Sequence, residues 1–205
     1  TFAPTATATS IRLLLSIAAI KNLNLRQLDV CSAFTSAPID REIYMHPPAG
    51  FSQKPGKVLK LKRALYGASQ SPRLFWIELK EHLRSLGFSS SDIDPCLWIR
   101  DTGDSYTIIT IVVDDMIVAT DTDPAWLVDG LSRRFKMKDL GTCSYVLGMR
   151  VRRNREERRI LLSQEGYIEK VLRAFNMEEE AKTNKPRTPA ARSVKLSASD
   201  CVDYG

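Results

Sequence analysis

Cysteine and histidine are scarce in this 205-residue sequence, which narrows the metal and redox chemistry open to it. The cysteines form no C-x-x-C pair, and only two histidines accompany them. A zinc site and a framework of disulfide bonds are therefore not expected. A reducing compartment is the default for thiols spaced as widely as these four: Cys31, Cys96, Cys143 and Cys201.

Long hydrophobic runs are also missing. The run near the start, IRLLLSIAAI, is interrupted by Arg12 and Ser16 and is too short to cross a bilayer. It also lacks the basic start and small-residue cleavage site of a signal peptide, so we do not interpret it as one. With neither a membrane span nor a signal peptide predicted, we expect no membrane partner. No G-x-x-x-x-G-K-[ST] motif is present, which argues against an ordinary P-loop NTPase.

The composition that remains is that of a globular protein, with 43% hydrophobic and 26% charged residues. The length fits one domain, or one domain with a piece of a second. The missing initiator methionine predicts that the sequence is a fragment. A net charge of +6 permits a polyanionic partner without establishing one.

The most informative stretch is SYTIITIVVDDMIVAT, residues 105–120, in which two β-branched runs meet at Asp114 and Asp115. This composition is typical of strands covered on both faces, and the pattern predicts a hairpin with two carboxylates at its tip. Adjacent like charges repel, and Asp-Asp is a poor two-residue turn. A divalent cation such as Mg²⁺ would compensate that cost, although a solvated turn is the ordinary alternative.

Asp29 is a second carboxylate in an apolar setting, at the end of a strand predicted over residues 23–30. A lone Asp at a strand end commonly serves as a cap or turn residue. If it lay opposite Asp114 and Asp115, it would complete a three-carboxylate site. Two divalent ions at such a site support phosphoryl transfer, which needs no histidine and no nucleophilic serine.

The order of predicted elements indicates an α+β fold. Helices are expected from Ser10 to about Asn22, over 71–86 with Ser71 as N-cap, over 124–136 capped by Asp123, and over 164–175 capped by Ser163. Residues 35–58 should be mostly loop, with a short strand at EIYM, and SYVLGMRV with RRILLS should form a hairpin turning around Asn154. The centre then follows the split β-α-β order of ferredoxin-like folds, with helices on one face and the aspartates at one sheet edge.

Two basic runs are candidates for a nucleic-acid track, although runs of this kind more often form a solvated face unless a metal site accompanies them. The first run contains Lys54, Lys57, Lys60, Lys62 and Arg63, and the second contains Arg150, Arg152, Arg153, Arg155, Arg158 and Arg159.

As an ordered set, several blocks resemble the reverse transcriptase of copia-type LTR retrotransposons over nearly the whole chain. They are TFAPTATATSIRLLLSIAAI, QLDVCSAF, EIYMHPPAGF, KLKRALYGASQSPR, VVDD, FKMKDLG, YVLGMRV and LSQEGYIEKVL. The resemblance implies a polymerase palm with partial fingers over residues 1–163, the start of a thumb over 164–177, and a linker toward RNase H over 178–205.

The resemblance also implies roles for individual residues. Asp29, Asp114 and Asp115 would be catalytic and, with the Val30 carbonyl, would bind two Mg²⁺ ions, for which Mn²⁺ could substitute. Phe34 would lie under the incoming sugar, and the nucleotide would also meet Tyr66, Gly67 and Gln70. Arg73, Gly148 and Arg150 would contact nucleic acid, the last two within the primer-gripping region.

The implied partners are an RNA or DNA template with its primer, dNTPs, and other Pol polyprotein domains such as integrase and RNase H. The implied location is cytoplasmic, in virus-like particles. The chain is expected to begin after the finger strands that hold the triphosphate and to end before RNase H.

Some residues depart from the family pattern. Val112 stands where the family places a tyrosine, and Ser36-Ala37 replaces a common Asn-Gly. These departures leave open a nonenzymatic nucleic-acid-binding remnant of a decayed element. A metal-dependent cyclase or other nucleotidyl transferase is a third reading, against which the LYG and LSQEGYIEKVL blocks argue.

Overall fold

The computed structural model describes residues 3–50 and 56–178. The chain divides into two compact units, with residues up to Leu162 in the first and residues from Ser163 on in the second. The predicted palm, thumb and linker limits remain predictions. Apart from its first residue, the predicted linker 178–205 lies outside the described residues.

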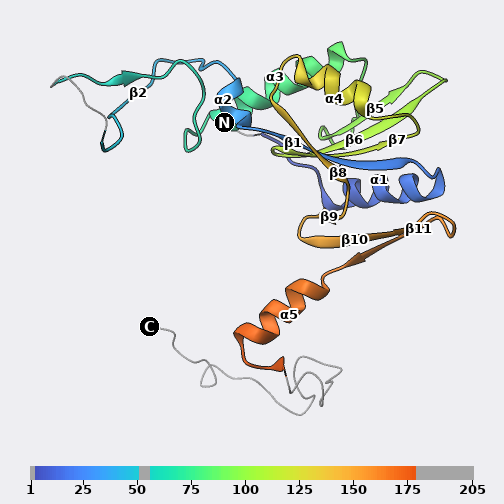
Figure 1. Ribbon diagram of the computed structural model, residues 1–205. Helices are drawn as coiled ribbons and strands as arrows, with labels where there is room; N and C mark the ends of the chain where they lie inside the picture. Colours follow the sequence, from blue (N-terminus) through green and yellow to red (C-terminus); the bar gives the residue numbers. More distant parts are fainter. Residues whose placement is uncertain (1–2, 51–55, 179–205) are drawn as a thin grey trace. The chain divides into compact units, whose positions relative to one another are not determined.

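The first unit is built on a six-stranded sheet in the order β4-β5-β6-β7-β1-β8 (Figure 1). Every neighbouring pair in it is antiparallel. The strands are β1 (Asn24–Val30), β4 (Ser89–Ser90), β5 (Leu97–Asp101), β6 (Tyr106–Val112), β7 (Asp115–Thr120) and β8 (Met137–Thr142). The five central residues of β6 are all buried. This confirms the prediction, made from the apolar run, that the strand is covered on both faces.

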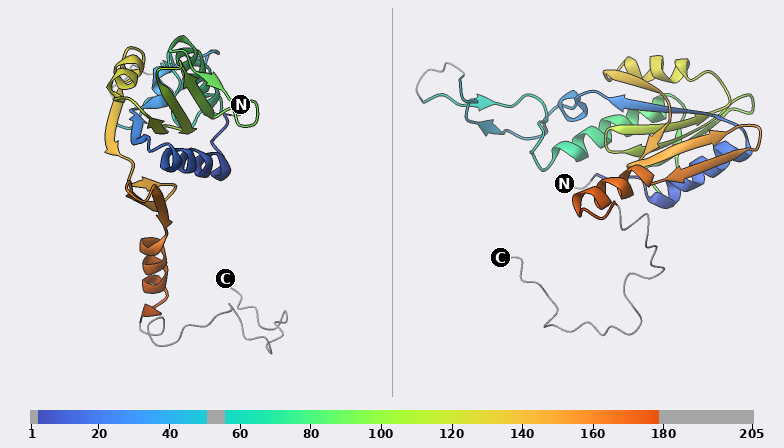
Figure 2. Two further views of the ribbon diagram at one scale, coloured as in Figure 1. Left: turned by 90° about the vertical axis from the view of Figure 1, so that its right-hand side faces the viewer. Right: turned by 60° about the horizontal axis from the view of Figure 1, so that its bottom comes forward.

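Helices cover both faces of this sheet (Figure 2). On one face, α3 (Ser71–Ser85) and α4 (Ala125–Ser132) pack against Leu28, Ile109, Ile111, Met116 and Val118. On the other, α1 (Ala8–Ile20) packs against Leu25, Ile108, Ile117 and Ala119. The two helices of the predicted centre, α3 and α4, thus share one face, and α1, which the sequence analysis did not place, covers the other, because alternate strand residues are apolar on both faces and each face needs a cover.

The start of α1 is anchored by Asp94, a residue that the sequence analysis did not single out. The helix begins at Ala8 rather than Ser10, and its N-cap Thr7 accepts the Ser10 N–H at 3.1 Å. The Asp94 side chain is only 4% exposed and accepts hydrogen bonds from the Ser10 hydroxyl, the Thr7 N–H at 3.0 Å and the Cys96 N–H at 2.9 Å. Burial alone would raise the pKa of Asp94, but these hydrogen bonds outweigh it and lower the pKa.

The end of α1 is held by arginines of a second, three-stranded sheet and of its β10–β11 turn; the strand order is β11-β10-β9. Its strands are β9 (Tyr145–Val146), β10 (Met149–Asn154) and β11 (Arg159–Ser163). Arg153 donates to the Ala18 carbonyl at 3.0 Å, and Arg158 donates to the Ile20 carbonyl at 3.0 Å. Cations are favourable at a helix C-terminus, so these members of the second basic run have a structural use that neither reading anticipated.

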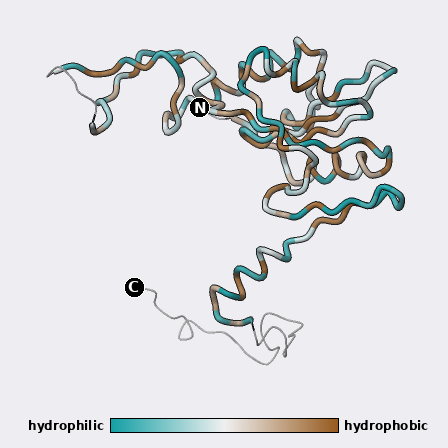
Figure 3. The backbone as a smooth tube through the Cα atoms, in the orientation of Figure 1, coloured by the Kyte–Doolittle hydropathy of each residue, from teal (hydrophilic) through white to brown (hydrophobic). Residues whose placement is uncertain are grey.

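The turn between β10 and β11 follows Asn154, as predicted, and is hydrophilic (Figure 3). A second, tight turn at Leu147-Gly148 joins β9 to β10, so the predicted single hairpin is two.

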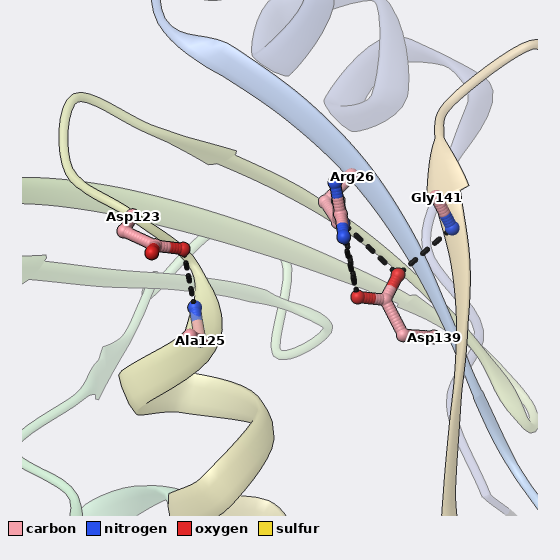
Figure 4. A network of polar contacts seen from close by, with 5 residues as sticks. All are labelled: Arg26, Asp123, Ala125, Asp139 and Gly141. Carbon is pink, nitrogen blue, oxygen red and sulfur yellow. Dashed lines mark hydrogen bonds and ion pairs between the residues drawn. The ribbon is translucent and has the colours of Figure 1, made fainter.

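Polar contacts tie the edge strand β8 to β1 and brace the turn ahead of α4 (Figure 4). Arg26 on β1 forms an ion pair with Asp139 on β8 at 2.8 Å, and Asp139 also accepts the Gly141 N–H at 2.8 Å. Asp123 accepts the Ala125 N–H at 3.0 Å, so its side chain binds the first turn of α4, but the N-cap position itself is occupied by Pro124 and not by Asp123 as predicted.

The predicted loop between residues 35 and 58 contains little regular structure where it is described. A short helix α2 (Ala33–Ser36) precedes it, and β2 (Tyr44–Met45) in the EIYM block pairs with β3 (Leu59–Lys60). Lys60 of the first basic run forms an ion pair with Glu42, whereas Lys54 lies outside the described residues.

The second unit contains α5 (Glu165–Ala174), which leaves Tyr167 and Ile168 exposed. The Ser163 hydroxyl accepts the Glu165 N–H at 3.2 Å, but the N-cap of α5 is Gln164 and not Ser163 as predicted. Within residues 3–50 and 56–178, no helix has the length and apolar character needed to cross a membrane.

Asp94→Ala is expected to lower the free energy of unfolding by about 1–3 kcal/mol, because it removes a buried acceptor from several donors. The folded-state pKa of Asp94 lies below its ordinary value of 3.8, so the stabilisation is complete above that pH and is lost as the pH falls through the lower folded pKa. Urea unfolding at pH 7 and at decreasing pH measures both effects.

The matched control is Asp92→Ala, which removes an exposed carboxylate two residues away. Equal losses in the two variants, or a loss that persists unchanged in acid, would contradict the anchoring role of Asp94.

Candidate active site

The β6–β7 hairpin turns through two residues, Val113 and Asp114, because Val112 pairs with Asp115. The expectation that both aspartates form the tip is therefore corrected, since Asp115 is the first residue of β7. Val113 has a φ of 59°, which suits a tight hairpin turn but is strained for a β-branched residue. Backbone strain of this kind costs about 1–3 kcal/mol and is found at functional sites.

Strand pairing brings Asp29 to this hairpin. Asp29 on β1 lies directly opposite Asp115 on β7 in the antiparallel register. The next residue, Val30, donates its N–H to the Asp114 carbonyl at 3.0 Å. The structure thus gathers all three predicted carboxylates at one place, on two neighbouring strands and the turn beside them.

Burial and mutual repulsion act on these carboxylates. The pKa of Asp114 is raised, chiefly by burial, with a contribution from the charges of Asp29 and Asp115 that a hydrogen bond from Tyr66 opposes. The pKa of Asp115 is raised by burial and by Asp29, against a hydrogen bond from Gln27. Among the described residues, the buried Asp114 Oδ1 has no hydrogen-bond partner.

Gln27 was not singled out from the sequence. It precedes Asp29 by two residues on β1, so both side chains point to the same face of the sheet. The alternation in the block QLD could have identified it as a neighbour of the carboxylates.

The donor types at this site fit a divalent cation, since hard ions such as Mg²⁺ prefer carboxylate and carbonyl oxygens. The orphaned, buried Asp114 Oδ1 is a further sign of a missing ligand. As placed, however, no three acidic, histidine or cysteine side chains of the described segments surround one point closely enough to hold an ion. The residue types fit a metal, and the side chains would have to move for the three carboxylates to converge on one ion.

The predicted nucleotide-side residues Phe34 and Tyr66 lie next to the carboxylates. Their ring centroids are 4.4 Å apart, and the Tyr66 hydroxyl donates to Asp114 Oδ2 at 3.2 Å. Phe34 is supported from behind by Phe75, with ring centroids 6.2 Å apart.

Tyr66 and Gly67 form the corners of a tight turn, in which the Ala68 N–H donates to the Leu65 carbonyl at 3.1 Å. Gly67 has a φ of 96°, a conformation that favours glycine at this turn position. Ser71 fixes the turn, because its hydroxyl donates to the Leu65 carbonyl at 2.7 Å and accepts the Leu65 N–H at 3.1 Å. Ser71 is therefore not the N-cap of α3, a position that Gln70 occupies.

Gln70 and Arg73 lie at the start of α3. The Gln70 side chain accepts the Ser69 hydroxyl at 3.4 Å, and Arg73 is exposed. In the described part of the chain, neither residue contacts the aspartates, and their predicted roles remain predictions.

Gly148 shares a pocket of about 210 Å³ with Asp115. Its other lining residues are Gln27, Val112, Ile117, Tyr145, Val146 and Leu147. Arg150 is exposed on β10, opposite Tyr145. A larger pocket of about 530 Å³, between α1 and β11, is lined by aliphatic and arginine side chains and contains none of the three aspartates.

The chain is similar in sequence to proteins of one known family. A family described as reverse transcriptase (RNA-dependent DNA polymerase) matches residues 1–189. The chain is 40% identical to the retrovirus-related Pol polyprotein from transposon TNT 1-94 of Nicotiana tabacum, over 98% of the chain and 15% of that protein. It is 39% identical to the corresponding polyprotein from transposon RE1 of Arabidopsis thaliana, over 96% of the chain and 13% of that protein.

Asp114→Asn is expected to raise the free energy of unfolding at pH 7, measured in a chelating buffer. The raised folded-state pKa means that wild-type stability falls as the pH rises through that pKa, and the amide removes this cost. Because the carboxylate is partly solvated, the gain should stay below about 1 kcal/mol. It should shrink as the pH falls toward the ordinary carboxyl value.

The control is Asp129→Asn, which neutralises an exposed carboxylate on α4. A net loss of stability in Asp114→Asn, or an equal gain in both variants, would contradict the cost inferred for the charged, partly buried Asp114.

Proposed function

The chain belongs to the reverse transcriptase (RNA-dependent DNA polymerase) family, and on that premise we propose that it supplies the nucleotidyl-transfer site of a copia-type retrotransposon polymerase. The observation that carries the proposal is the pairing of Asp29 with Asp115 across β1 and β7, beside Asp114. The chain spans 15% and 13% of the two curated relatives, so the activity and partners of the whole protein are part of the proposal.

In the proposed reaction, the 3′-OH of a primer attacks the α-phosphate of a dNTP. A bond forms between the primer oxygen and that phosphorus, the bond to the bridging oxygen of the β-phosphate breaks, and pyrophosphate leaves with the electron pair. The hydroxyl proton is released to solvent. The chain's task is to position the reactants and to oppose the charge that develops on them.

Reverse transcriptases generally use divalent metals. Here Asp29, Asp114, Asp115 and the Val30 carbonyl would hold two Mg²⁺ ions, or Mn²⁺ as a substitute. When bound, such ions supply positive charge to the attacking and leaving oxygens. The raised pKa values of Asp114 and Asp115 support this assignment, because a bound cation would offset both causes of the rise, the burial of the carboxylates and the smaller repulsion from their neighbours.

The remaining residues would bind substrate. Phe34 would lie under the deoxyribose, where its ring, held by Phe75, leaves little room for a 2′-OH. Tyr66, Gly67 and Gln70 would face the nucleotide. Gly67 has open space where a Cβ would stand, which permits a base pair to approach the backbone.

Template and primer would run past the same edge of the sheet. Gly148 lines the pocket beside Asp115, a suitable place for the primer terminus. Arg73 and Arg150 are exposed and would contact phosphates, in a chain whose net charge is +6. The ferredoxin-like palm with partial fingers, the other Pol domains as partners, and a cytoplasmic location in virus-like particles complete the proposal.

One observation favours a second function. Val112 replaces the tyrosine that the family places before the turn, and it lines the pocket beside Asp115. Loss of that ring would remove aromatic support near the primer end. A chain that binds primer-template without extending it, as a remnant of a decayed element, is the alternative.

Primer extension separates these functions. The substrate is a labelled DNA primer on poly(rA) with dTTP and Mg²⁺, and the enzyme is this chain in parallel with a form lengthened upstream of residue 1. We expect Mg²⁺-dependent extension by the longer form, reduced at least about a thousandfold by Asp114→Asn, because the carboxylate acts on the transition state.

The control is Asp129→Asn, which should extend the primer like the parent protein. If both parent forms fold and bind primer-template but extend nothing, the binding remnant replaces the polymerase.

A further inference from the structure

Tyr66 stands where two ligands of the proposed polymerase site would have to bind. Its hydroxyl holds Asp114 Oδ2 at 3.2 Å, and its ring lies over Phe34 with centroids 4.4 Å apart. Asp114 is one of the proposed metal ligands, and Phe34 is the proposed floor of the sugar site. A single side chain therefore covers both.

The same contact accounts for the position of Asp114. One of its oxygens is held by Tyr66, and the other is buried with no partner in the described part of the chain. Asp29 and Asp115 already face each other across β1 and β7. The three carboxylates nevertheless do not converge on a point within residues 3–50 and 56–178, and Asp114 is the one that Tyr66 binds.

The backbone under Tyr66 is fixed, whereas its side chain can move. Ser71 binds both the N–H and the carbonyl of Leu65, and the Ala64 N–H donates to the Ala37 carbonyl at 3.0 Å. The Tyr66 side chain itself is 49% exposed. Rotation about its side-chain bonds would release Asp114 and uncover Phe34 without unfolding the turn.

We propose that Tyr66 is a gate: in the unliganded chain it occupies the sugar site over Phe34 and holds Asp114 away from the other carboxylates, and it swings out when a divalent cation draws Asp114 in. This inference rests on the proposed function, since it concerns the regulation of the same site. It couples the two ligands, because a cation that captures Asp114 also frees the face of Phe34 for a nucleotide.

The test measures Mn²⁺ binding to the 205-residue chain, with the EPR signal of free Mn²⁺ as the readout. Tyr66→Phe removes the hydroxyl and keeps the ring. It should bind Mn²⁺ about three- to tenfold more tightly than the parent chain, because the metal no longer competes with a hydrogen bond to a carboxylate. Adding Asp114→Asn to Tyr66→Phe should abolish the gain.

Tyr44→Phe is the matched control. The Tyr44 hydroxyl also donates to a carboxylate, Glu42 Oε2 at 3.0 Å, and Tyr44 is 53% exposed against 49% for Tyr66. This variant should bind Mn²⁺ like the parent chain.

A second measurement follows the gate directly. The method is fluorine NMR of the chain with 3-fluorotyrosine in place of all six tyrosines. The resonance that is absent from the Tyr66→Phe spectrum is assigned to Tyr66. Saturating Mg²⁺ should move that resonance toward the shift of a solvent-exposed tyrosine. A resonance that stays in place while the metal binds would overturn the gate.

The binding outcomes separate the gate from the site. If the parent chain and Tyr66→Phe bind Mn²⁺ equally and Asp114→Asn weakens both, the gate is wrong and the metal site of the proposed function stands. If Asp114→Asn changes nothing in either background, both proposals are wrong.

Discussion

The antiparallel pairing of β1 with β7 is the constraint on which the rest of the structure depends. It sets Asp29 against Asp115 and lets the Val30 N–H hold the Asp114 carbonyl. A slip of one residue would turn every β1 side chain to the opposite face. Such a slip is opposed on both sides, because Leu28 is buried under α3 and α4 while Leu25 is buried under α1.

This rigid frame carries a site that is unfavourable in itself. Carboxylates repel one another, Val113 adopts a strained φ, and one oxygen of Asp114 is buried without a partner in the described residues. The core of the sheet and the anchors at both ends of α1 supply the stability that offsets these costs. Sites that bind a charged ligand commonly carry such costs until the ligand is present.

The features that the sequence predicted correctly are those determined by residues close together in the chain. Two β-branched runs around Asp114 and Asp115 indicated the hairpin, and the apolar run before Asp29 indicated its strand. The hydrogen bond from the first turn of α4 to Asp123 and the loop between residues 35 and 58 followed from local turn chemistry.

Contacts between segments far apart in the sequence could not be predicted from local patterns of this kind. Asp94 binds Thr7 and Ser10 across more than 80 positions, and no local signal marks it. The position of α1 on the second face, and the use of Ser71 to hold Leu65 instead of capping α3, likewise depend on tertiary contacts. The Tyr66–Asp114 contact belongs to the same class, since two loops 48 residues apart must meet to form it.

The central claim is that Asp29, Asp114 and Asp115 together hold a divalent cation. Replacing Mg²⁺ by Fe²⁺ and adding ascorbate with peroxide generates hydroxyl radicals at the bound ion, which cut the polypeptide nearby. The account predicts cuts on both sides of the strand pair, near residue 29 and near residues 114–115, and their suppression by excess Mg²⁺. Cuts confined to other acidic positions, such as Asp121 and Asp123 at the far end of β7, or cuts that Mg²⁺ does not suppress, would contradict it.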